Sequence, residues 1–508
     1  MENIRVRFAP SPTGALHIGG IRTALYNYLL AKKHGGTFIL RIEDTDQSRY
    51  VPGAEEYIIE ALRWCGLLPD EGPEFGGDYG PYRQSERKHL YAQYAEQLVA
   101  NGHAYYAFDT AEALDAHRVQ DKTFKYGAAT RLRLTNSLTL PASEVQQRIA
   151  NGEPWVIRLQ VPDNELVVVP DLIRGEVTFR SKELDDKVML KSDGMPTYHL
   201  ANIVDDYLMR ITHVIRGEEW LPSTGHHVLL YRYLGWEAAM PQFAHLPLIL
   251  KPDGKGKLSK RDGARLGIPV FPLGWAGDTP EESFQGFREF GFLPQAMLNF
   301  LAFQGWNPGT EQEIFTIPEL IEAFSLEKIG KSGARFDFEK AKWYNQQYVH
   351  TADAATLATF VRPLLETKGY HPEPAFLESF CTLLRERVTL LPEFWEKGAF
   401  FFTEPKEYDA KNVQKRWDAT TRNLFEQLTD TLRAIADNQW SEPRVHQTVQ
   451  EFMDQHELKP GALFPLLRIA LAGSTQGPAL FGMMELLGKS KTIARLDSAL
   501  PRFDGFVA

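Results

Sequence analysis

The stretch from Arg7 to Gly20, RFAPSPTGALHIGG, constrains the fold of this chain more than any other part of it. An apolar strand from Ile4 to Phe8 leads into a turn rich in proline and glycine, and a helix begins near His17. Such a corner points backbone N–H groups and the positive end of a helix dipole at the space above the turn. The stretch therefore predicts an α/β fold with an anion site at this corner, for which phosphate is the natural occupant.

A strand–helix–strand pattern continues after this corner. Apolar residues fall on one face of the helix, Gly35 and Gly36 end it, and Thr37–Ile42 is an apolar run typical of a buried strand. The same pattern resumes far downstream, with a strand at Ile211–Arg216, a helix capped by Ser223 or Thr224, and a strand at Leu246–Leu250. These two halves predict one parallel sheet.

The predicted secondary structure changes between these two halves and again after the second one. Two valine-rich segments, Val167–Val169 and Val177–Phe179, predict an inserted domain with strands of its own. From about Lys340 onward strand signals fade and amphipathic helical spacing dominates. At 508 residues the chain is too long for one core, so three or four domains are expected.

Four polar segments fall where predicted strands end, namely Pro10–Gly14, Glu43–Asp46, Gly217–Trp220 and the glycine-flanked KLSKR segment Lys257–Arg261. Open parallel sheets bind ligands at the carboxyl ends of their strands. Each segment alone is compatible with an ordinary surface loop, but their agreement on one edge favours a shared ligand site.

The HIGG and KLSKR segments, in this order, resemble the HIGH and KMSKS motifs of class I aminoacyl-tRNA synthetases. Further segments resemble bacterial glutamyl-tRNA synthetases: Ser11–Gly14, Arg41–Asp46, Gly80–Arg87, Tyr198–Asp206 and Leu463–Arg468. The resemblance spans nearly the whole chain. Gly20 stands where many class I enzymes have a second histidine, so a mechanism with two histidines is not carried over.

The resemblance implies an α/β fold: a class I Rossmann catalytic domain split by an α/β insertion, then a stem-contact region and an all-α anticodon-binding half. The expected boundaries are 1–95 and 196–250 for the catalytic halves, 96–195 for the inserted acceptor-end-binding domain, 251–335 for the KLSKR loop with the stem-contact region, and 336–508 for the helical domain.

The resemblance also implies a reaction, in which ATP and L-glutamate form glutamyl-adenylate before the acyl group passes to tRNA(Glu). It makes His17, Lys257 and Lys260 catalytic. The expected ATP site consists of these three residues with Gly19, Gly20, Glu219, Trp220, Ser259 and Arg261. Mg²⁺ would accompany ATP, carried largely by phosphates and water.

Recognition of the two other substrates is also implied. A bidentate arginine is well suited to a planar carboxylate. The residues expected around glutamate are Arg7, Ser11, Glu43, Tyr198, Asn202 and Arg216. For the anticodon, Arg387 is expected to read the third base and Arg385 to brace a phosphate or a helix end. A solvent-facing Arg387 paired with Glu386 or Glu393 is the alternative.

Three competing interpretations can be weighed against the sequence. A glutaminyl-tRNA synthetase shares the motifs but ends in β-barrels, whereas the C-terminal half of this chain is helical by periodicity. A truncated paralogue that glutamylates a tRNA base lacks the anticodon half, so a length of 508 residues excludes it. A catalytically inactive tRNA-binding relative is the third. The intact His17, Lys257, Lys260, Glu43 and Arg216 argue against it.

Charge and cysteine content add weaker constraints. With 56 Lys and Arg against 66 Asp and Glu the net charge is −10, so basic residues would have to be concentrated locally to bind nucleic acid. The two cysteines, Cys65 and Cys381, lie far apart, and no signal peptide or spanning segment is evident. We therefore expect a cytoplasmic protein without a membrane contact. Some members of the resembled family hold zinc with a cysteine cluster in the insertion, and because no cysteine lies between Cys65 and Cys381 we expect no zinc here. The protein is also expected to be a monomer.

Overall fold

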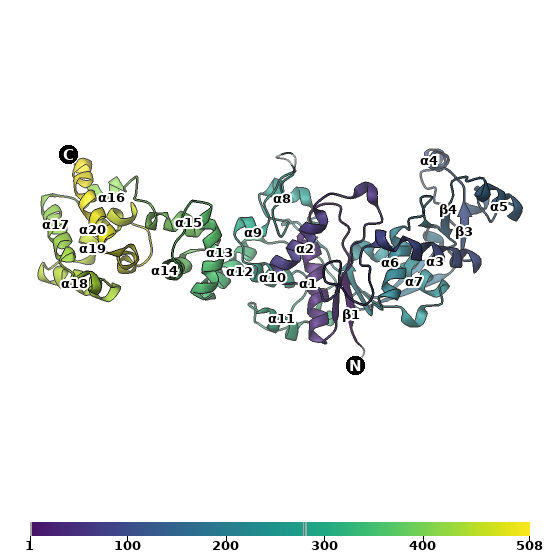
Figure 1. The fold of residues 1–508 in the computed structure, drawn as a ribbon, viewed down its shortest axis with the longest axis horizontal. Helices are drawn as coiled ribbons and strands as arrows, with labels where there is room; N and C mark the ends of the chain where they lie inside the picture. The colour runs from purple at the N-terminus through teal and green to yellow at the C-terminus, as the bar shows by residue number, and fades with distance from the viewer. Residues whose placement is uncertain (1–2, 278, 280–281, 508) are drawn as a thin grey trace. The chain divides into compact units, whose positions relative to one another are not determined.

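The computed structural model describes residues 3–277, 279 and 282–507. It divides into two compact units, residues 1–289 with 294–341 and residues 290–293 with 342–508. The first unit is built on a six-stranded sheet (Figure 1), whose strands lie in the order β2 (Thr37–Leu40), β1 (Arg5–Phe8), β8 (His213–Gly217), β9 (Gln242–Leu246), β5 (Leu166–Asp171) and β6 (Gly175–Arg180).

The first five of these strands run parallel, and only β6 is antiparallel to its neighbour. From β1 the chain moves to one side of the sheet, toward β2, and from β8 it moves to the other side, toward β9. The carboxyl ends of β1 and β8, at Phe8 and Gly217, therefore flank the point where the strand order reverses. Ligands of open α/β sheets bind at such points.

The predicted strand at Leu246–Leu250 is not one continuous strand of the parallel sheet, because it is interrupted after Leu246. The parallel strand is β9, which ends at Leu246, and the following β10 (Ile249–Leu250) pairs with β11 (Ala334–Arg335) in a separate two-stranded sheet. Pro247 lies between the two strands and offers no N–H to a ladder. The helix cap at Ser223 or Thr224 is also wrong, because α7 (Leu221–Tyr233) begins earlier and carries a proline in its first turn.

The inserted segment differs from the prediction as well. Its valine-rich strands are β5 and β6, which extend the main sheet through the pairing of Asp171 with Phe243 on β9. A separate antiparallel sheet is formed instead by β3 (Ala104–Ala107), β4 (Val156–Leu159) and β7 (Val188–Leu190). On β5 alternate residues are buried and exposed, because one face packs against α7 and the other is open.

Helix α1 (Ile18–Lys33) covers the sheet behind the first turn. His17 is its N-cap, Lys32 and Lys33 lie in its last turn, and Gly35 follows with a φ of 62°. The other α-helices that begin in this unit are α2 (Ala54–Cys65), α3 (Lys88–Ala100), α4 (Ala111–Gln120), α5 (Ala142–Ala150), α6 (Tyr198–Leu208), α8 (Lys260–Leu266), α9 (Phe287–Phe290), α10 (Pro294–Ala302), α11 (Ile317–Ala323) and α12 (Phe338–Thr351).

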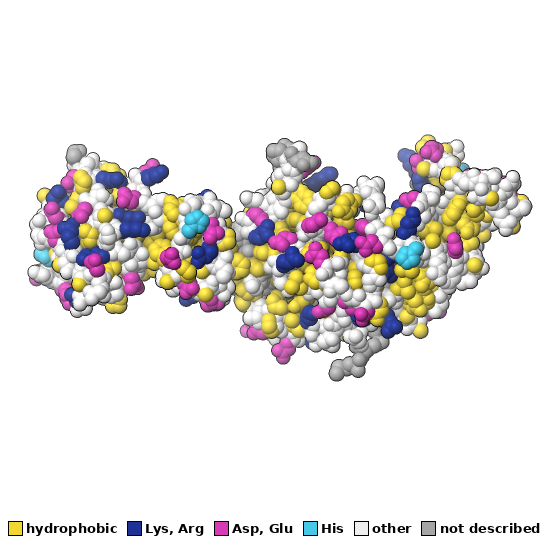
Figure 2. Space-filling model, in the orientation of Figure 1, with side chains coloured by type: hydrophobic (Ala, Val, Ile, Leu, Met, Phe, Trp, Pro, Cys, Tyr) yellow, Lys and Arg dark blue, Asp and Glu magenta, His cyan; other side chains and the backbone are white. Residues whose placement is uncertain are grey.

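The second unit has no strand among its described residues. After α12 its α-helices are α13 (Ala354–Glu366), α14 (Pro374–Leu384), α15 (Glu393–Gly398), α16 (Ala410–Gln414), α17 (Ala419–Arg433), α18 (Glu442–Gln455), α19 (Pro460–Ala472) and α20 (Leu480–Val507), the last broken at Gly488. On the visible face of each unit, Lys and Arg side chains are interspersed with Asp and Glu (Figure 2). This face therefore carries mixed charge over both units.

Candidate active site

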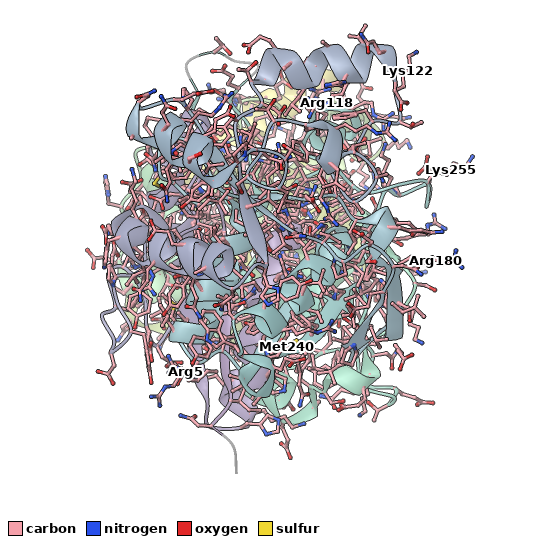
Figure 3. All side chains as sticks on the ribbon, turned by 90° about the vertical axis from the view of Figure 1, so that its right-hand side faces the viewer. Arg5, Arg118, Lys122, Arg180, Met240 and Lys255 are labelled. Carbon is pink, nitrogen blue, oxygen red and sulfur yellow. The ribbon has the colours of Figure 1, made fainter. Side chains whose placement is uncertain are left out.

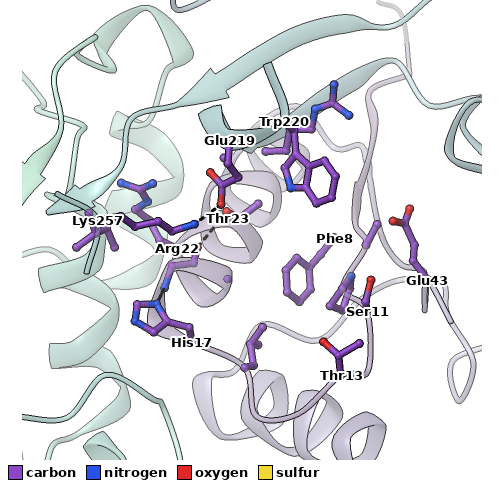
Figure 4. A pocket seen from close by; sticks show the side chains of 18 of the residues that line it. Phe8, Ser11, Thr13, His17, Arg22, Thr23, Glu43, Glu219, Trp220 and Lys257 are labelled. Atoms are coloured by element: carbon purple, nitrogen blue, oxygen red, sulfur yellow. Dashed lines mark hydrogen bonds and ion pairs between the residues drawn. The ribbon is translucent and has the colours of Figure 1, made fainter. Parts of the chain in front are cut away.

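A cavity of about 660 Å³ opens at the carboxyl edge of the sheet, at the reversal between β1 and β8. Side chains from the first turn, from β8 and from the KLSKR loop converge on it (Figure 4). The structure brings together here Arg7, Ser11, His17, Gly19, Gly20, Glu43, Tyr198, Asn202, Arg216, Glu219, Trp220, Lys257, Ser259 and Lys260. Arg261 does not line the cavity but is exposed on α8.

His17 presents a hydrogen-bond donor to this cavity. Its Nδ1 accepts a hydrogen bond from the backbone N–H of Gly19 at 3.1 Å. Burial, reinforced by the charges of Lys257 and Lys260, lowers the pKa of His17 to about 3. The ring is therefore neutral at neutral pH with its proton on Nε2, which is buried and has no partner among the described residues. A buried donor of this kind is stabilised when a ligand oxygen accepts from it.

The two lysines of the KLSKR loop differ in their partners. Lys257 Nζ lies 2.6 Å from Glu219 Oε1, in the ion pair marked in Figure 4. Lys260 has no carboxylate partner within the described part of the chain. It lies over the first turn, where a Cβ added at Gly14 would be 3.7 Å from its Nζ. Ser259 caps α8 through Asp262, which fixes the start of the helix that carries Lys260.

Glu219 lies close to the glycine at the end of β8. A Cβ added at Gly217 would lie 2.1 Å from Glu219 Oε2, so a larger residue there would push the end of this flexible side chain aside. Glycine at this position leaves the carboxylate where it pairs with Lys257 at the cavity.

A balanced charge cluster forms one wall of the cavity. Asp206 on α6 accepts from Arg7 at 3.1 Å and from Arg41 at 2.8 Å, and Arg41 also contacts Glu43 at 3.2 Å. All four side chains are buried. Burial opposes ionisation of Asp206, but the two guanidinium groups prevail and lower its pKa. Burial raises the pKa of Glu43 although Arg41 lowers it, so this carboxylate is stabilised by any further cation.

Arg216 stands apart from this cluster. Its guanidinium donates to Tyr198 Oη at 2.9 Å, Thr224 Oγ1 at 2.9 Å and His245 Nε2 at 3.0 Å, all of them neutral acceptors. Arg216 is 5% exposed and has no carboxylate partner among the described residues. A buried cation without an anion is costly, so this site favours an anionic ligand.

Two predicted polar residues link the walls. Asn202 donates to Glu43 Oε1 at 3.0 Å, and its own Oδ1 is buried without a partner in the described chain. Tyr198, one helical turn before Asn202 on α6, reaches Arg216. The Asn202 amide and the Tyr198 hydroxyl are thus oriented by other protein groups, and Asn202 Oδ1 can accept a hydrogen bond from a ligand.

The sequence analysis assigned no role in the site to several residues that support these groups: Arg41, Asp171, Asp206, Thr224, His227 and His245. Asp206 had a usable signal, because it follows Asn202 by four residues and shares its face of α6. Arg41 lies inside the predicted strand Thr37–Ile42, whereas the observed β2 ends at Leu40, so the prediction concealed its place at the strand end. No local pattern marks Asp171 and His245, which meet only through the pairing of β5 with β9.

The two arginines expected at the anticodon lie in the second unit and behave differently. Arg385 donates to the carbonyl oxygen of Ala352 at 3.2 Å and lies 3.7 Å from Glu386. The Arg387 side chain is exposed and has no ion-pair partner among the described residues. Its charge contributes to a lowered pKa of Arg468, after the larger effect of burial, so a second cation lies nearby.

Metal ligands and membrane spans give little further guidance. Within the described ranges no three His, Cys, Asp or Glu side chains are grouped as they would be to hold a metal ion. Cys65 and Cys381 are buried free thiols. In the part of the chain that the structure describes, no helix is both long and apolar enough to span a bilayer.

Comparison with known proteins identifies the family. Residues 3–343 match the model for the catalytic domain of class I tRNA synthetases for glutamate and glutamine, and residues 355–500 match an anticodon-binding domain. The chain belongs to this class I family, with an α/β catalytic domain and a helical anticodon-binding domain. The helical second unit agrees with the predicted all-α half.

The relatives narrow the family further. The chain is 52% identical to the glutamate–tRNA ligase of Amoebophilus asiaticus over 98% of both chains, and 52% identical to that of Porphyromonas gingivalis over 98% of this chain and 99% of the relative. A crystal structure of a glutamate tRNA ligase from Elizabethkingia meningosepticum, in complex with its amino acid, superposes with a TM-score of 0.92. It is 46% identical and covers 98% of this chain and 99% of that one.

Proposed function

We propose that this protein is a glutamate–tRNA ligase, which activates L-glutamate with ATP to glutamyl-adenylate and transfers the glutamyl group to the 3′-terminal ribose of tRNA(Glu), releasing pyrophosphate and AMP. Its relatives at 52% identity over nearly the whole chain support this assignment. The observation that carries the proposal within the molecule is the buried, uncompensated guanidinium of Arg216 in the same cavity as His17 and the KLSKR lysines.

Glutamate fits the two walls of the cavity in one orientation. Its γ-carboxylate would accept from Arg216, and from the guanidinium N–H groups of Arg7 that Asp206 leaves free. Its α-ammonium would donate to Glu43 and to the free Oδ1 of Asn202. A glutamine side chain is neutral and would leave Arg216 uncompensated, so the cavity favours glutamate. Ser11, from the first turn, lies beside this position.

ATP would occupy the corner between the first turn and the KLSKR loop. An oxygen of the glutamate α-carboxylate attacks the α-phosphorus, and the bond to the bridging oxygen breaks with its electron pair leaving on pyrophosphate. His17 Nε2–H would donate to a phosphate oxygen, and Lys260 would stabilise the charge that develops on pyrophosphate. Lys257 would join it after releasing Glu219. Gly19, Gly20, Ser259 and Trp220 complete the proposed ATP site within the cavity. Arg261, which is exposed on α8 outside the cavity lining, would have to approach the phosphates from the loop side.

Mg²⁺ is expected to accompany ATP. The donor set fits a metal held mainly by phosphate oxygens and water, with Glu219, the carboxylate that Lys257 would release, as the acidic side chain among the described residues of this corner. When bound, the metal neutralises phosphate charge. No zinc is included in the proposal.

Exposed cations support tRNA as the second substrate. Arg118, Lys122, Arg180 and Lys255 are exposed on the first unit, and the last three extend along one edge of the view in Figure 3. Lys122, Arg180 and Lys255 have no carboxylate partner among the described residues, so they are available to phosphates. Arg387 would read the anticodon from the second unit. We include in the proposal that the enzyme acts as a cytoplasmic monomer.

The proposal is tested by ATP–pyrophosphate exchange and by charging of tRNA(Glu). We expect exchange with glutamate only when tRNA(Glu) is present, since family members activate the amino acid on tRNA binding, and no exchange with glutamine or aspartate. An inactive tRNA-binding relative would bind tRNA without exchange or charging. Charging of tRNA with glutamine instead of glutamate would overturn the substrate assignment.

A further inference from the structure

We propose that Asp171 and His245 are positioning residues for Arg216, which hold its guanidinium toward the substrate while leaving its charge unneutralised. This inference rests on the proposed function. It adds two residues that touch no substrate, one from the inserted segment and one from β9.

The contacts of Asp171 fix its carboxylate completely. Oδ2 accepts from His245 Nδ1 at 2.6 Å and from the His245 backbone N–H at 3.1 Å. Oδ1 accepts from the backbone N–H groups of Ile173 at 3.0 Å and Arg174 at 2.8 Å. Neither the Asp171 nor the His245 side chain is exposed to solvent. The carboxylate therefore has only donors around it and one orientation.

This carboxylate determines the tautomer of His245. With Nδ1–H donating to Asp171, the lone pair on Nε2 remains to accept from Arg216 Nε, 3.0 Å away. Burial lowers the pKa of His245, although Asp171 raises it, so the ring stays neutral. The opposite tautomer would place Nε2–H against the N–H of Arg216, and the guanidinium would have to turn away.

The interposed imidazole also separates the two charges. Asp206 contacts Arg7 directly and neutralises it, whereas Asp171 reaches Arg216 only through the ring of His245. A direct carboxylate would compete with the γ-carboxylate of glutamate for the same N–H groups. The ring orients the guanidinium without this competition, so glutamate meets a pre-organised cation.

The test compares variants in the full-length enzyme, measuring the KM for glutamate and kcat in tRNA-dependent exchange, with thermal unfolding as the fold control. In Asp171→Asn the amide can donate to His245 Nδ1 and favour the wrong tautomer. We expect KM for glutamate to rise about tenfold or more, kcat to change less, and the preference over glutamine to fall. Asp185→Asn is the matched control, because Asp185 faces His226 and not Arg216.

A double variant separates positioning from packing. In His245→Gln the side-chain oxygen can accept from Arg216 without help from Asp171, so KM should stay within about threefold of the wild type. Adding Asp171→Asn to His245→Gln should then leave KM unchanged. An equal rise of KM on both backgrounds would show that Asp171 acts only on strand packing and would overturn the inference.

A third variant covers the case in which Asp171→Asn does not fold. His245→Leu fills the space without an acceptor and should raise KM about tenfold, unlike His245→Gln. Equal KM values for these two variants would overturn the inference. The proposed function fails separately, because it requires glutamate-dependent exchange by the wild-type enzyme, whatever the variants do.

Discussion

The two walls of the cavity differ in whether the charges of their arginines are compensated by carboxylates. Around Asp206, two guanidinium groups and two carboxylates balance one another before any ligand arrives. Around Arg216, every acceptor among the described residues is neutral. This difference indicates that the substrate anion binds at the wall of Arg216, since a carboxylate is stabilised most by a buried cation that no other anion compensates. The same contrast recurs between Lys257, which pairs with Glu219, and Lys260, which has no carboxylate partner among the residues that the structure describes.

The contrast is tested most strongly at Arg216. In Arg216→Ala the substrate carboxylate loses its uncompensated cation but keeps its desolvation cost. We expect glutamate binding to weaken by roughly 2–5 kcal/mol and the preference over glutamine to fall. Measurement of KM for both amino acids in tRNA-dependent exchange checks this. An unchanged glutamate KM would place Arg216 outside the substrate site.

The next largest effect is expected at Lys260. Lys260→Ala removes an exposed charge without touching the core, so the fold should persist while adenylate formation slows about 10²–10³-fold. The loss should lie in kcat rather than in glutamate KM, because the contact strengthens as charge moves onto pyrophosphate. Lys257→Ala is the paired counterpart and should cost less, since Lys257 must first leave Glu219. Near-normal exchange by Lys260→Ala would remove Lys260 from the mechanism.

The second unit repeats the comparison at its two arginines. Arg387 has no ion-pair partner among the described residues, whereas Arg385 donates to the carbonyl oxygen of Ala352. Arg387→Gln should relax the rejection of tRNA(Gln) by roughly 1–3 kcal/mol, the usual contribution of one base-reading contact. Arg385→Gln should weaken discrimination less, measured by charging both tRNAs. Equal charging of both tRNAs by the unmodified enzyme would contradict the reading role of Arg387.

The smallest effect is expected from the protonation of His17. Because its folded pKa is about 3, His17 stays neutral well below its unfolded value, so it should add no inflection to the rate between about pH 5 and 8. The ratio of wild-type to His17→Asn exchange rates should be constant over this range. The stability of the fold, in contrast, should depend on pH. Below about pH 6.5 His17 is protonated in the unfolded chain but stays neutral in the folded chain, so its contribution lowers the free energy of unfolding increasingly toward pH 3. A rate ratio that falls above pH 6.5 would identify His17 as a general acid.

The sequence-based predictions were most accurate where the structure depends on residues that are close together in the sequence. The corner at His17 depends on a strand, a turn and a cap within a few residues, and its elements lie where the pattern put them. The strand predicted at Leu246–Leu250 was misplaced because the run is apolar throughout, and the missing N–H donor of Pro247 does not show in its hydrophobic pattern.

The convergence of distant segments on one edge of the sheet was predicted, but the direct contacts between individual distant side chains were not. Arg7 and Asp206 are 199 residues apart, and Asp171 and His245 are 74 apart. Such pairs depend on strand order and register, which no local periodicity specifies. The same limit explains why the valine-rich segments were assigned to the insertion rather than to the main sheet.

The separation of Arg7 from Asp206 has a consequence during synthesis. The ribosome adds about 5–20 residues each second. Because Asp206 follows Arg7 by 199 residues, about 10–40 s pass between the synthesis of Arg7 and that of Asp206. Through that interval β1 cannot be buried with its charge compensated. The nascent amino-terminal half must remain soluble with its future substrate site open, and the catalytic sheet can close only after the insertion has been translated.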